Sequence, residues 1–207
     1  MCVGLDPITV ARCQALISAN ARGVERGHLI AFTDDGALLQ ELFTADGIGT
    51  QISAQNEDLI RQARLEDVAD IVEIIRPLED DGVLVPRSRA QLEQEIAHFF
   101  IAELDGVVVG CCAVYAFADA AELACVAVHE QYRHQYSDMG IGSALLETAE
   151  KAAEAHGAKS LFALTTQTQE WFVNHGFTPT DVETLPSGKQ SLYNWQRGAA
   201  VLQKHLN

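Results

Sequence analysis

The chemistry that this chain can perform centres on one acid and one pair of glycines. Glu122 lies within the apolar run 121–129, and Gly140 and Gly142 form a Gly-x-Gly that opens an apolar-periodic segment. Desolvation raises the pKa of an enclosed carboxylate, which can then take a proton directly or through water. A strand, a polar turn and Gly-x-Gly at a helix start are typical of a phosphate site. From spacing alone, the alternative for Glu122 is an exposed acid at the end of a strand.

Composition limits the partners of the chain. Of its 207 residues, 48% are hydrophobic and 21% are charged, as in globular proteins, and the formal net charge is -15. Such an acidic chain is not expected to bind nucleic acid or an anionic membrane, and an anionic cofactor needs a local positive site. No apolar run approaches the roughly 18 residues that span a bilayer. No secretory signal is recognised, so we expect a cytoplasmic protein.

The cysteines do not follow a metal-binding or redox pattern. There is no Cys-x-x-Cys and no Cys/His spacing suited to zinc, so we expect no metal site and five structural cysteines. Adjacent residues of a strand point to opposite faces, so Cys111 and Cys112 are expected to be small buried residues on either side of a sheet. The five are Cys2, Cys13, Cys111, Cys112 and Cys125.

Before residue 53 the pattern predicts only short elements. Apolar residues at helical spacing predict a helix over 7–20 with Thr9 as its candidate N-cap. A strand over 28–32, a helix over 37–43 and a turn at 46–52 into another strand follow. These elements are too few for a comfortable independent core. We therefore expect this part to pack on the rest of the chain, to pair with another chain, or to be the remnant of a larger domain.

A polar stretch at 53–58 predicts a boundary, and a self-consistent α/β (α+β) pattern follows it. The pattern predicts a helix that starts at Glu66 or Asp67 and stops near Pro77, a helix capped by Ser88, and a hairpin around Asp105-Gly106. The other expected strands are 59–64, 121–129, 160–164 and one that starts at 177; the other expected helices are 142–156 and 169–175; and 199–206 is either strand or helix.

This order of elements, with Gly-x-Gly between the fourth strand and the third helix, resembles the GNAT family of acetyl-CoA-dependent N-acetyltransferases. Residues 58–207 are similar to the acetyltransferase domain of the bacterial amino-acid N-acetyltransferases, the N-acetylglutamate synthase family. The phrases that carry the similarity are 75–79, 87–93, 122–129, 161–166, 170–172, 175–177 and 192–197. Residues 28–50 are similar to the C-terminal end of the amino acid kinase-like domain of that family, which implies that 1–53 is a remnant of it in a truncated or split enzyme.

The resemblance implies a GNAT fold, with a mixed central sheet flanked by helices, and a reaction. Acetyl would pass from acetyl-CoA to the α-amine of L-glutamate by direct attack, without a metal, as the first step of arginine biosynthesis. It implies that Glu122 is the general base and that Thr165 meets the leaving thiolate. The alternative for Thr165 is a hydroxyl that satisfies local backbone at a strand end.

The same resemblance implies a cofactor site. The backbone of Cys125, Val126, Ala127 and Val128 would bind the pantetheine arm, and Gly140, Ile141 and Gly142 would bind the pyrophosphate. The family has Gln or Arg three residues before the first glycine, where this chain has Ser137, followed by Asp138 in a longer loop. Arg133 or His134 are the candidate replacement cations. Cys125 is expected to be a packing group, because apolar neighbours raise the pKa of a thiol.

For the acceptor, the resemblance implies that Arg87 and Arg197 bind the two carboxylates, because guanidinium groups bind them bidentately. Lys189 is a further cation, and backbone near Val85 and Cys125 receives the amino group. The family serine two residues after Arg197 is Ala199 here. His129, His156 and His175 have no spacing partner and are expected to be cap or surface residues.

Two alternatives remain open. The acceptor could be another amino acid, a small amine or a protein N-terminus, or the chain could be a noncatalytic regulatory module. For partners we expect a homo-oligomer or pairing with a kinase-like chain. Since the family places arginine feedback in the kinase-like domain, we expect weak arginine inhibition or none.

Overall fold

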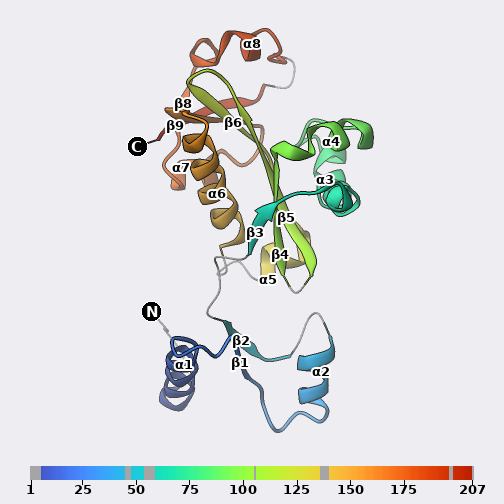
Figure 1. The fold of residues 1–207 in the computed structure, drawn as a ribbon, viewed down its shortest axis with the longest axis vertical. Helices are drawn as coiled ribbons and strands as arrows, with labels where there is room; N and C mark the ends of the chain where they lie inside the picture. Colours follow the sequence, from blue (N-terminus) through green and yellow to red (C-terminus); the bar gives the residue numbers. More distant parts are fainter. Residues whose placement is uncertain are drawn as a thin grey trace. The chain divides into compact units, whose positions relative to one another are not determined.

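The computed structural model describes residues 6–44, 48–53, 59–104, 106–135, 140–195 and 198–206. The chain divides into two compact units, residues 1–58 and 59–207. Both are drawn in Figure 1. None of the helices in these ranges is long and apolar enough to cross a membrane.

The first unit contains two helices and a two-stranded antiparallel sheet among its described residues: α1 (Pro7–Asn20), β1 (Arg26–Leu29), α2 (Ala37–Phe43) and β2 (Thr50–Ser53). The expected cap of α1 was wrong. Asp6 is the N-cap and accepts from the amides of Ile8 and Thr9 at 2.9 and 3.2 Å, while the Thr9 hydroxyl donates to Asp6. A carboxylate one turn earlier reaches both amides, which leaves Thr9 inside the helix.

Glu41 ties the elements of the first unit together. Its carboxylate lies 2.6 Å from Nδ1 of His28 in β1 and accepts from the amides of Ile48 and Gly49 at 2.8 and 2.7 Å. The His28 hydrogen bond and these two amides hold the pKa of Glu41 at about 2. Many apolar side chains of this unit remain exposed, among them Ile8, Ile17, Leu38, Leu39, Leu42 and Phe43.

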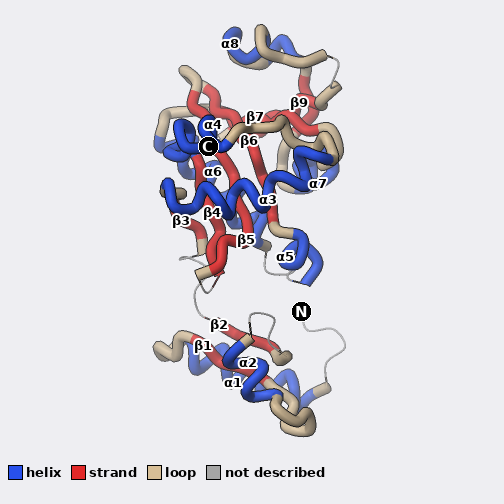
Figure 2. The backbone as a smooth tube through the Cα atoms, turned by 90° about the vertical axis from the view of Figure 1, so that its right-hand side faces the viewer, coloured by secondary structure: helices blue, strands red, loops and turns tan. Residues whose placement is uncertain are grey.

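The second unit is built on a seven-stranded mixed sheet with the order β3-β4-β5-β6-β7-β9-β8. Only the β6–β7 pair is parallel among the described pairings. Figure 2 shows these strands side by side. The C-terminal segment is therefore a strand, which settles the strand-or-helix alternative. The strands are β3 (Ile60–Gln62), β4 (Phe99–Leu104), β5 (Val107–Ala116), β6 (Ala120–Val128), β7 (Ser160–Thr165), β8 (Thr178–Thr180) and β9 (Ala200–His205).

Helices cover both faces of this sheet (Figure 1). One core joins the sheet to α3 and α4, and the other joins it to α6 and α7. Cys111 belongs to the first core and Cys112 to the second, so the expected opposite orientation of these thiols is confirmed. The helices are η1 (Leu65–Asp67), α3 (Val68–Asp80), α4 (Arg89–Glu95), η2 (Ile96–His98), α5 (Glu130–Gln135), α6 (Ile141–Ala155), α7 (Gln169–Asn174), η4 (Val182–Thr184) and α8 (Ser187–Gln190).

Local sequence signals predicted the bounds of several elements correctly and those of others wrongly. Ser88 caps α4 by accepting from the Gln91 amide at 3.2 Å, as expected. The hairpin strands β4 and β5 are also confirmed, although Asp105 lies outside the described residues. Pro77 does not stop α3, which continues to Asp80. A proline removes only one amide, and its carbonyl still accepts from Asp81 at 3.0 Å. The short helix α5 was not expected.

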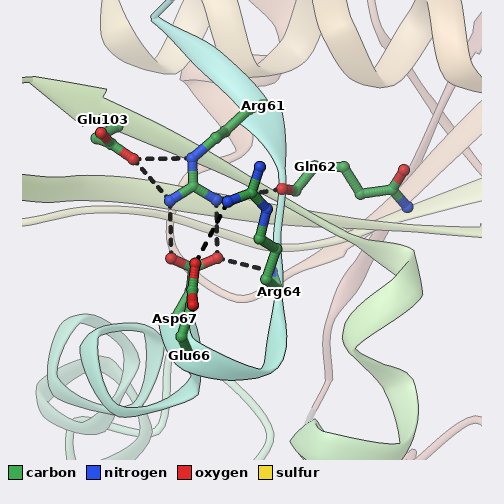
Figure 3. A network of polar contacts seen from close by, with 6 residues as sticks. All are labelled: Arg61, Gln62, Arg64, Glu66, Asp67 and Glu103. Carbon is green, nitrogen blue, oxygen red and sulfur yellow. Dashed lines mark hydrogen bonds and ion pairs between the residues drawn. The ribbon is translucent and has the colours of Figure 1, made fainter. Parts of the chain in front are cut away.

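An ion-pair network fixes the start of α3 against the sheet (Figure 3). Arg61 of β3 donates bidentately to Asp67, with both distances 2.9 Å, and its Nε donates to Glu103 of β4 at 2.8 Å. Asp67 also accepts from the Arg64 amide at 2.6 Å. The hydrogen bonds from Arg61 lower the pKa of the buried Asp67 carboxyl, against the effect of burial. This network holds α3 against the edge of the sheet.

Candidate active site

The site begins at an irregularity in β6. The β5–β6 register shifts between Cys111 and Ala113, and opposite this shift Cys125 has φ of 51°. A left-handed conformation is costly for a residue with a side chain, so it marks a position that the surrounding fold enforces. On the other side of β6, the parallel pairing with β7 runs only from Ala120 to Leu123. The end of β6 is thereby released from β7.

A cavity of about 490 Å³ opens at this point. One wall is the released end of β6, another is the first turn of α6, and the third is the end of β7 with α7. Nine of the residues expected to act in cofactor binding or catalysis lie together in these walls: Cys125, Val126, Ala127, Val128, Arg133, Gly140, Ile141, Gly142 and Thr165. Their individual roles remain predictions.

The first turn of α6 provides backbone donors. Gly140 is its N-cap with φ of 64°, and no side chain caps the helix there. The amides of Ile141, Gly142 and Ser143 therefore point out of a 15-residue helix whose dipole favours an anion. A Cβ on Gly142 would lie 3.3 Å from Cζ2 of Trp171, so glycine keeps this turn close to α7. The geometry fits a pyrophosphate.

The expected cations near this turn are only partly described. Arg133 in α5 lines the cavity and donates to the Val128 carbonyl at 3.0 Å. His134 lies in α5, but its side chain is outside the described part of the structure, as are Ser137 and Asp138. A guanidinium at the cavity wall supplies a local positive charge in a chain whose net charge is -15.

Thr165 has a second hydroxyl beside it. The buried Thr165 Oγ1 accepts from the Thr168 amide at 3.0 Å and lies 2.8 Å from Thr168 Oγ1. Thr165 thus forms a hydrogen bond with the local backbone, as the alternative prediction stated. Its own hydroxyl proton is still available for donation. Both threonines line the cavity. The sequence analysis missed Thr168, although a hydroxyl three residues after a strand end is a recognisable turn signal.

His175 is the C-cap of α7, as expected, and both of its ring nitrogens have hydrogen-bond partners. Its Nδ1 lies 2.8 Å from the Trp171 carbonyl, and its Nε2 lies 2.9 Å from Ser143 Oγ in the first turn of α6. A carbonyl only accepts, so Nδ1 carries the proton, and Nε2 of the neutral ring accepts from the serine hydroxyl. The ring also lies 4.2 Å from the Trp171 ring centroid. His175 therefore positions a serine that lines the cavity. His156 is likewise a C-cap, at the end of α6, as expected.

The side chain of Glu122 pairs with Lys189. Glu122 is buried in β6 between Tyr115 of β5 and Phe162 of β7. Its Oε1 lies 2.7 Å from Lys189 Nζ of α8, with 9% and 23% of the two side chains exposed. The structure thus joins the expected base to an expected substrate cation. The alternative of an exposed strand-end acid is wrong, because the carboxylate is enclosed.

Arg87 occupies a neighbouring charged cluster. It donates to the Val85 carbonyl at 3.1 Å, and its amide donates to Glu79 at 2.9 Å. Burial opposes the charge of Arg87, but Cys125, Tyr115 and Glu95 nearby raise its pKa. Tyr115 lies opposite Glu122 in the β5–β6 pair. Its hydroxyl donates a hydrogen bond to Glu95 at 2.6 Å.

Tyr115 and Glu95 were not predicted, since strand register brings Tyr115 opposite Glu122 and a contact with α4 brings Glu95 to the Tyr115 hydroxyl. Burial and the Glu95 hydrogen bond raise the pKa of Tyr115. Burial likewise raises the pKa of Cys125 to about 11, despite the opposing effect of Arg87, which fits a packing thiol. The other expected guanidinium, Arg197, lies outside the described residues.

Comparison with known proteins identifies relatives of this chain. Residues 95–179 match the acetyltransferase (GNAT) domain family. The chain is 46% identical over 201 residues to an amino-acid acetyltransferase of Aeromonas salmonicida, covering 96% of this chain and 45% of that protein. It is 47% identical over 194 residues to the Pseudomonas aeruginosa protein of the same name, covering 93% and 44%. The chain spans less than half the length of these curated relatives.

Solved structures of similar fold include those of an N-acetylglutamate synthase. The N-acetylglutamate synthase of Neisseria gonorrhoeae, complexed with coenzyme A and N-acetyl-glutamate, is similar with a TM-score of 0.71 and 38% identity, over 99% of this chain and 48% of that one. The same synthase complexed with coenzyme A and L-arginine gives 0.74 and 37%, over 99% and 46%. A Mycobacterium tuberculosis protein gives 0.61 at 24% identity, over 72% and 99%, which shows the fold alone. The expected mixed-sheet fold and the expected resemblance are both confirmed.

Proposed function

Since the second unit carries a GNAT acetyltransferase domain, we propose that this chain moves the acetyl group of acetyl-CoA to the α-amine of L-glutamate. One observation carries the proposal. The released end of β6 forms a cavity with the uncapped first turn of α6, and the carboxylate of Glu122 lies on the same strand directly before that cavity wall. This arrangement would supply an anion site at the start of α6, a cavity for the thioester beside β6, and a base on β6.

The cofactor half of the reaction follows from the cavity walls. The amides of Ile141, Gly142 and Ser143 would hold the pyrophosphate, with Arg133 as a neighbouring cation. The backbone of Val126 would orient the thioester carbonyl for attack. Thr165 would give its hydroxyl proton to the departing sulfur and regain one from solvent or from Thr168. Bound acetyl-CoA supplies the activated acyl group for the transfer.

The acceptor half centres on Glu122. Its carboxylate would take a proton from the α-ammonium group, and the resulting neutral amine would attack the thioester carbon. Arg87 and Arg197 would bind the two carboxylates of glutamate, because planar guanidinium groups suit bidentate contacts. We propose that a substrate carboxylate draws Lys189 from Glu122, which frees the base only when an acidic amino acid is present.

The first unit has a proposed origin and a proposed partner. We propose that residues 1–53 are the end of an amino acid kinase-like domain, and that the exposed apolar residues of α1 and α2 contact a second copy of this chain or a separate kinase-like chain. The mass of the protein in solution, measured alone and with such a chain, tests this. For the proposed step of arginine biosynthesis, we propose a cytoplasmic location.

A thiol-release assay with acetyl-CoA and individual amino acids tests the function. We expect turnover with glutamate, weaker turnover with aspartate, and little with neutral amino acids or small amines. A neutral preferred acceptor would mean the same chemistry on another substrate. Acetyl-CoA binding without turnover on any acceptor would contradict an enzymatic role and favour a regulatory module.

A further inference from the structure

We propose that Lys189 is itself an acetyl acceptor, so that the enzyme acetylates its own Lys189 when no amino acid is bound. The inference rests on the proposed function, because it uses the same base and the same thioester. It assigns a modification site to α8. It also accounts for the contact between the Lys189 amine and Glu122, the carboxylate that is expected to deprotonate the acceptor amine.

The first support is the distance between amine and base. Lys189 Nζ lies 2.7 Å from Glu122 Oε1. A general base has to lie within about 2.6–3.2 Å of the group whose proton it takes, so Lys189 stands where an acceptor amine would stand. Both side chains are largely enclosed, with 23% and 9% exposed, so bulk water competes little for this contact.

The second support is that the fold holds Lys189 in place. The side chain of Gln190 donates to the carbonyls of Glu183 and Leu185 at 3.0 and 2.7 Å. Leu185 is buried in one cluster with Phe162, the residue opposite Glu122 in β7. The segment that carries Lys189 is therefore anchored beside Glu122, and its amine has a raised effective concentration there.

The third support is the cavity. Glu122 directly precedes Leu123, and the cavity wall runs from Leu123 to Val128 along the same strand. With a rise of about 3.4 Å per residue, Glu122 lies roughly one residue from the wall along which the thioester would run. The transfer would require the four-carbon lysine stem to carry Nζ from Glu122 toward that wall.

The step balances without any further reactant. Glu122 takes a proton from the Lys189 ammonium group, and the neutral amine forms a bond to the thioester carbon. The carbon–sulfur bond breaks, and the thiolate takes the second amine proton through Thr165 to leave as CoA thiol. Glu122 then releases its proton to solvent. The products are Nζ-acetyl-lysine and CoA.

The chain contains matched controls, since its four lysines are Lys151, Lys159, Lys189 and Lys204. Lys204 contacts Glu150 at 2.6 Å with 27% and 21% of the side chains exposed. Glu150 lies further along α6 than Ser143, where the cavity wall ends in that helix, whereas Glu122 directly precedes the part of β6 that lines the cavity. Lys151 contacts Glu147 at 2.9 Å with 72% and 68% exposed. Uncatalysed acetylation favours the exposed Lys151, whereas acetylation by the site favours Lys189 over its counterpart Lys204.

The experiment incubates the whole protein with acetyl-CoA and quantifies acetyl groups on each lysine peptide by mass spectrometry. We expect Lys189 to be labelled about tenfold faster than Lys204 or Lys151. Excess glutamate should suppress the labelling, and Glu122→Gln should slow it by about 100-fold while Glu150→Gln leaves it unchanged. Label that is equal on all lysines, or greatest on Lys151, would overturn the inference.

The inference and the proposed function can fail separately. Turnover of glutamate without label on Lys189 would overturn the inference and leave the function standing. Label on Lys189 without turnover of any amino acid would support the inference and contradict the glutamate proposal. The ratio of Lys189 to Lys204 label in the unaltered protein decides the inference even if Glu122→Gln fails to fold, which circular dichroism would reveal.

Discussion

The hydroxyl of Ser143 in α6 lies 2.9 Å from Nε2 of His175, the C-cap of α7. The other ring nitrogen holds the His175 ring in this orientation, because Nδ1 lies 2.8 Å from the Trp171 carbonyl. A side chain of α7 thereby orients a residue in the first turn of α6, where the anion site is proposed.

His175→Ala should therefore weaken cofactor binding more than chemistry. Losing one hydrogen bond of about 1 kcal/mol raises the KM for acetyl-CoA roughly fivefold, while kcat changes little. Steady-state kinetics at varied acetyl-CoA measure this, and His156→Ala at the other end of α6 is the control. An unchanged KM would show that Ser143 and His175 do not serve the cofactor.

Glu122→Gln should abolish most of the activity. An amide keeps the shape of the side chain but cannot take a proton, so kcat should fall by about 10²- to 10⁴-fold. The Kd for acetyl-CoA, measured by calorimetry, should stay unchanged because the cofactor contacts lie further along β6. Glu150→Gln removes a similar lysine-paired carboxylate and should leave kcat intact. A fully active Glu122→Gln enzyme would rule out this base.

Arg87→Ala should mainly affect the acceptor. A charge-assisted contact of about 1.5–3 kcal/mol predicts a rise in the glutamate KM of roughly 10- to 100-fold. Arg87→Lys should rescue poorly, because an ammonium group cannot make the bidentate contact. The exposed Arg89, which pairs with Glu93 in α4, provides the control variant. We expect Arg197→Ala to behave like Arg87→Ala, and unchanged kinetics in both would contradict the acceptor site.

Asp67→Asn should destabilise the second unit. Removing one partner of a largely buried pair leaves Arg61 without its bidentate acceptor and costs about 3 kcal/mol in the free energy of unfolding at neutral pH. Denaturant unfolding measures the loss. Glu66→Gln breaks the exposed pair with Arg64, which has 68% and 70% of its side chains exposed, and should cost less than about 0.5 kcal/mol.

The same pair predicts a pH dependence. The pKa of Asp67 is lower in the folded protein than its ordinary value of 3.8, chiefly through the Arg61 hydrogen bonds. The stabilisation is therefore fully present above that value and is lost as pH falls through the lower folded pKa. The difference in unfolding free energy between the native protein and Asp67→Asn should shrink below about pH 4. A constant difference down to pH 2 would contradict this origin.

Much of the architecture follows from local patterns in the sequence. The Asp105-Gly106 pair predicts the β4–β5 hairpin, Ser88 predicts the start of α4, and adjacent positions predict opposite faces for Cys111 and Cys112. These features depend on backbone preferences and side-chain period within a few residues, which the sequence displays directly. The phrase from Glu122 to His129 and the glycines at 140 and 142 likewise indicated the strand and the helix turn.

Only the tertiary structure decided which side chains meet. Lys189 reaches Glu122, His175 reaches Ser143, and Tyr115 faces Glu122 through packing and strand register that no local pattern contains. The left-handed Cys125 exists because the surrounding sheet compensates its cost. Sequence alone thus determined most of the elements and the candidate base, whereas long-range packing determined the partner of that base.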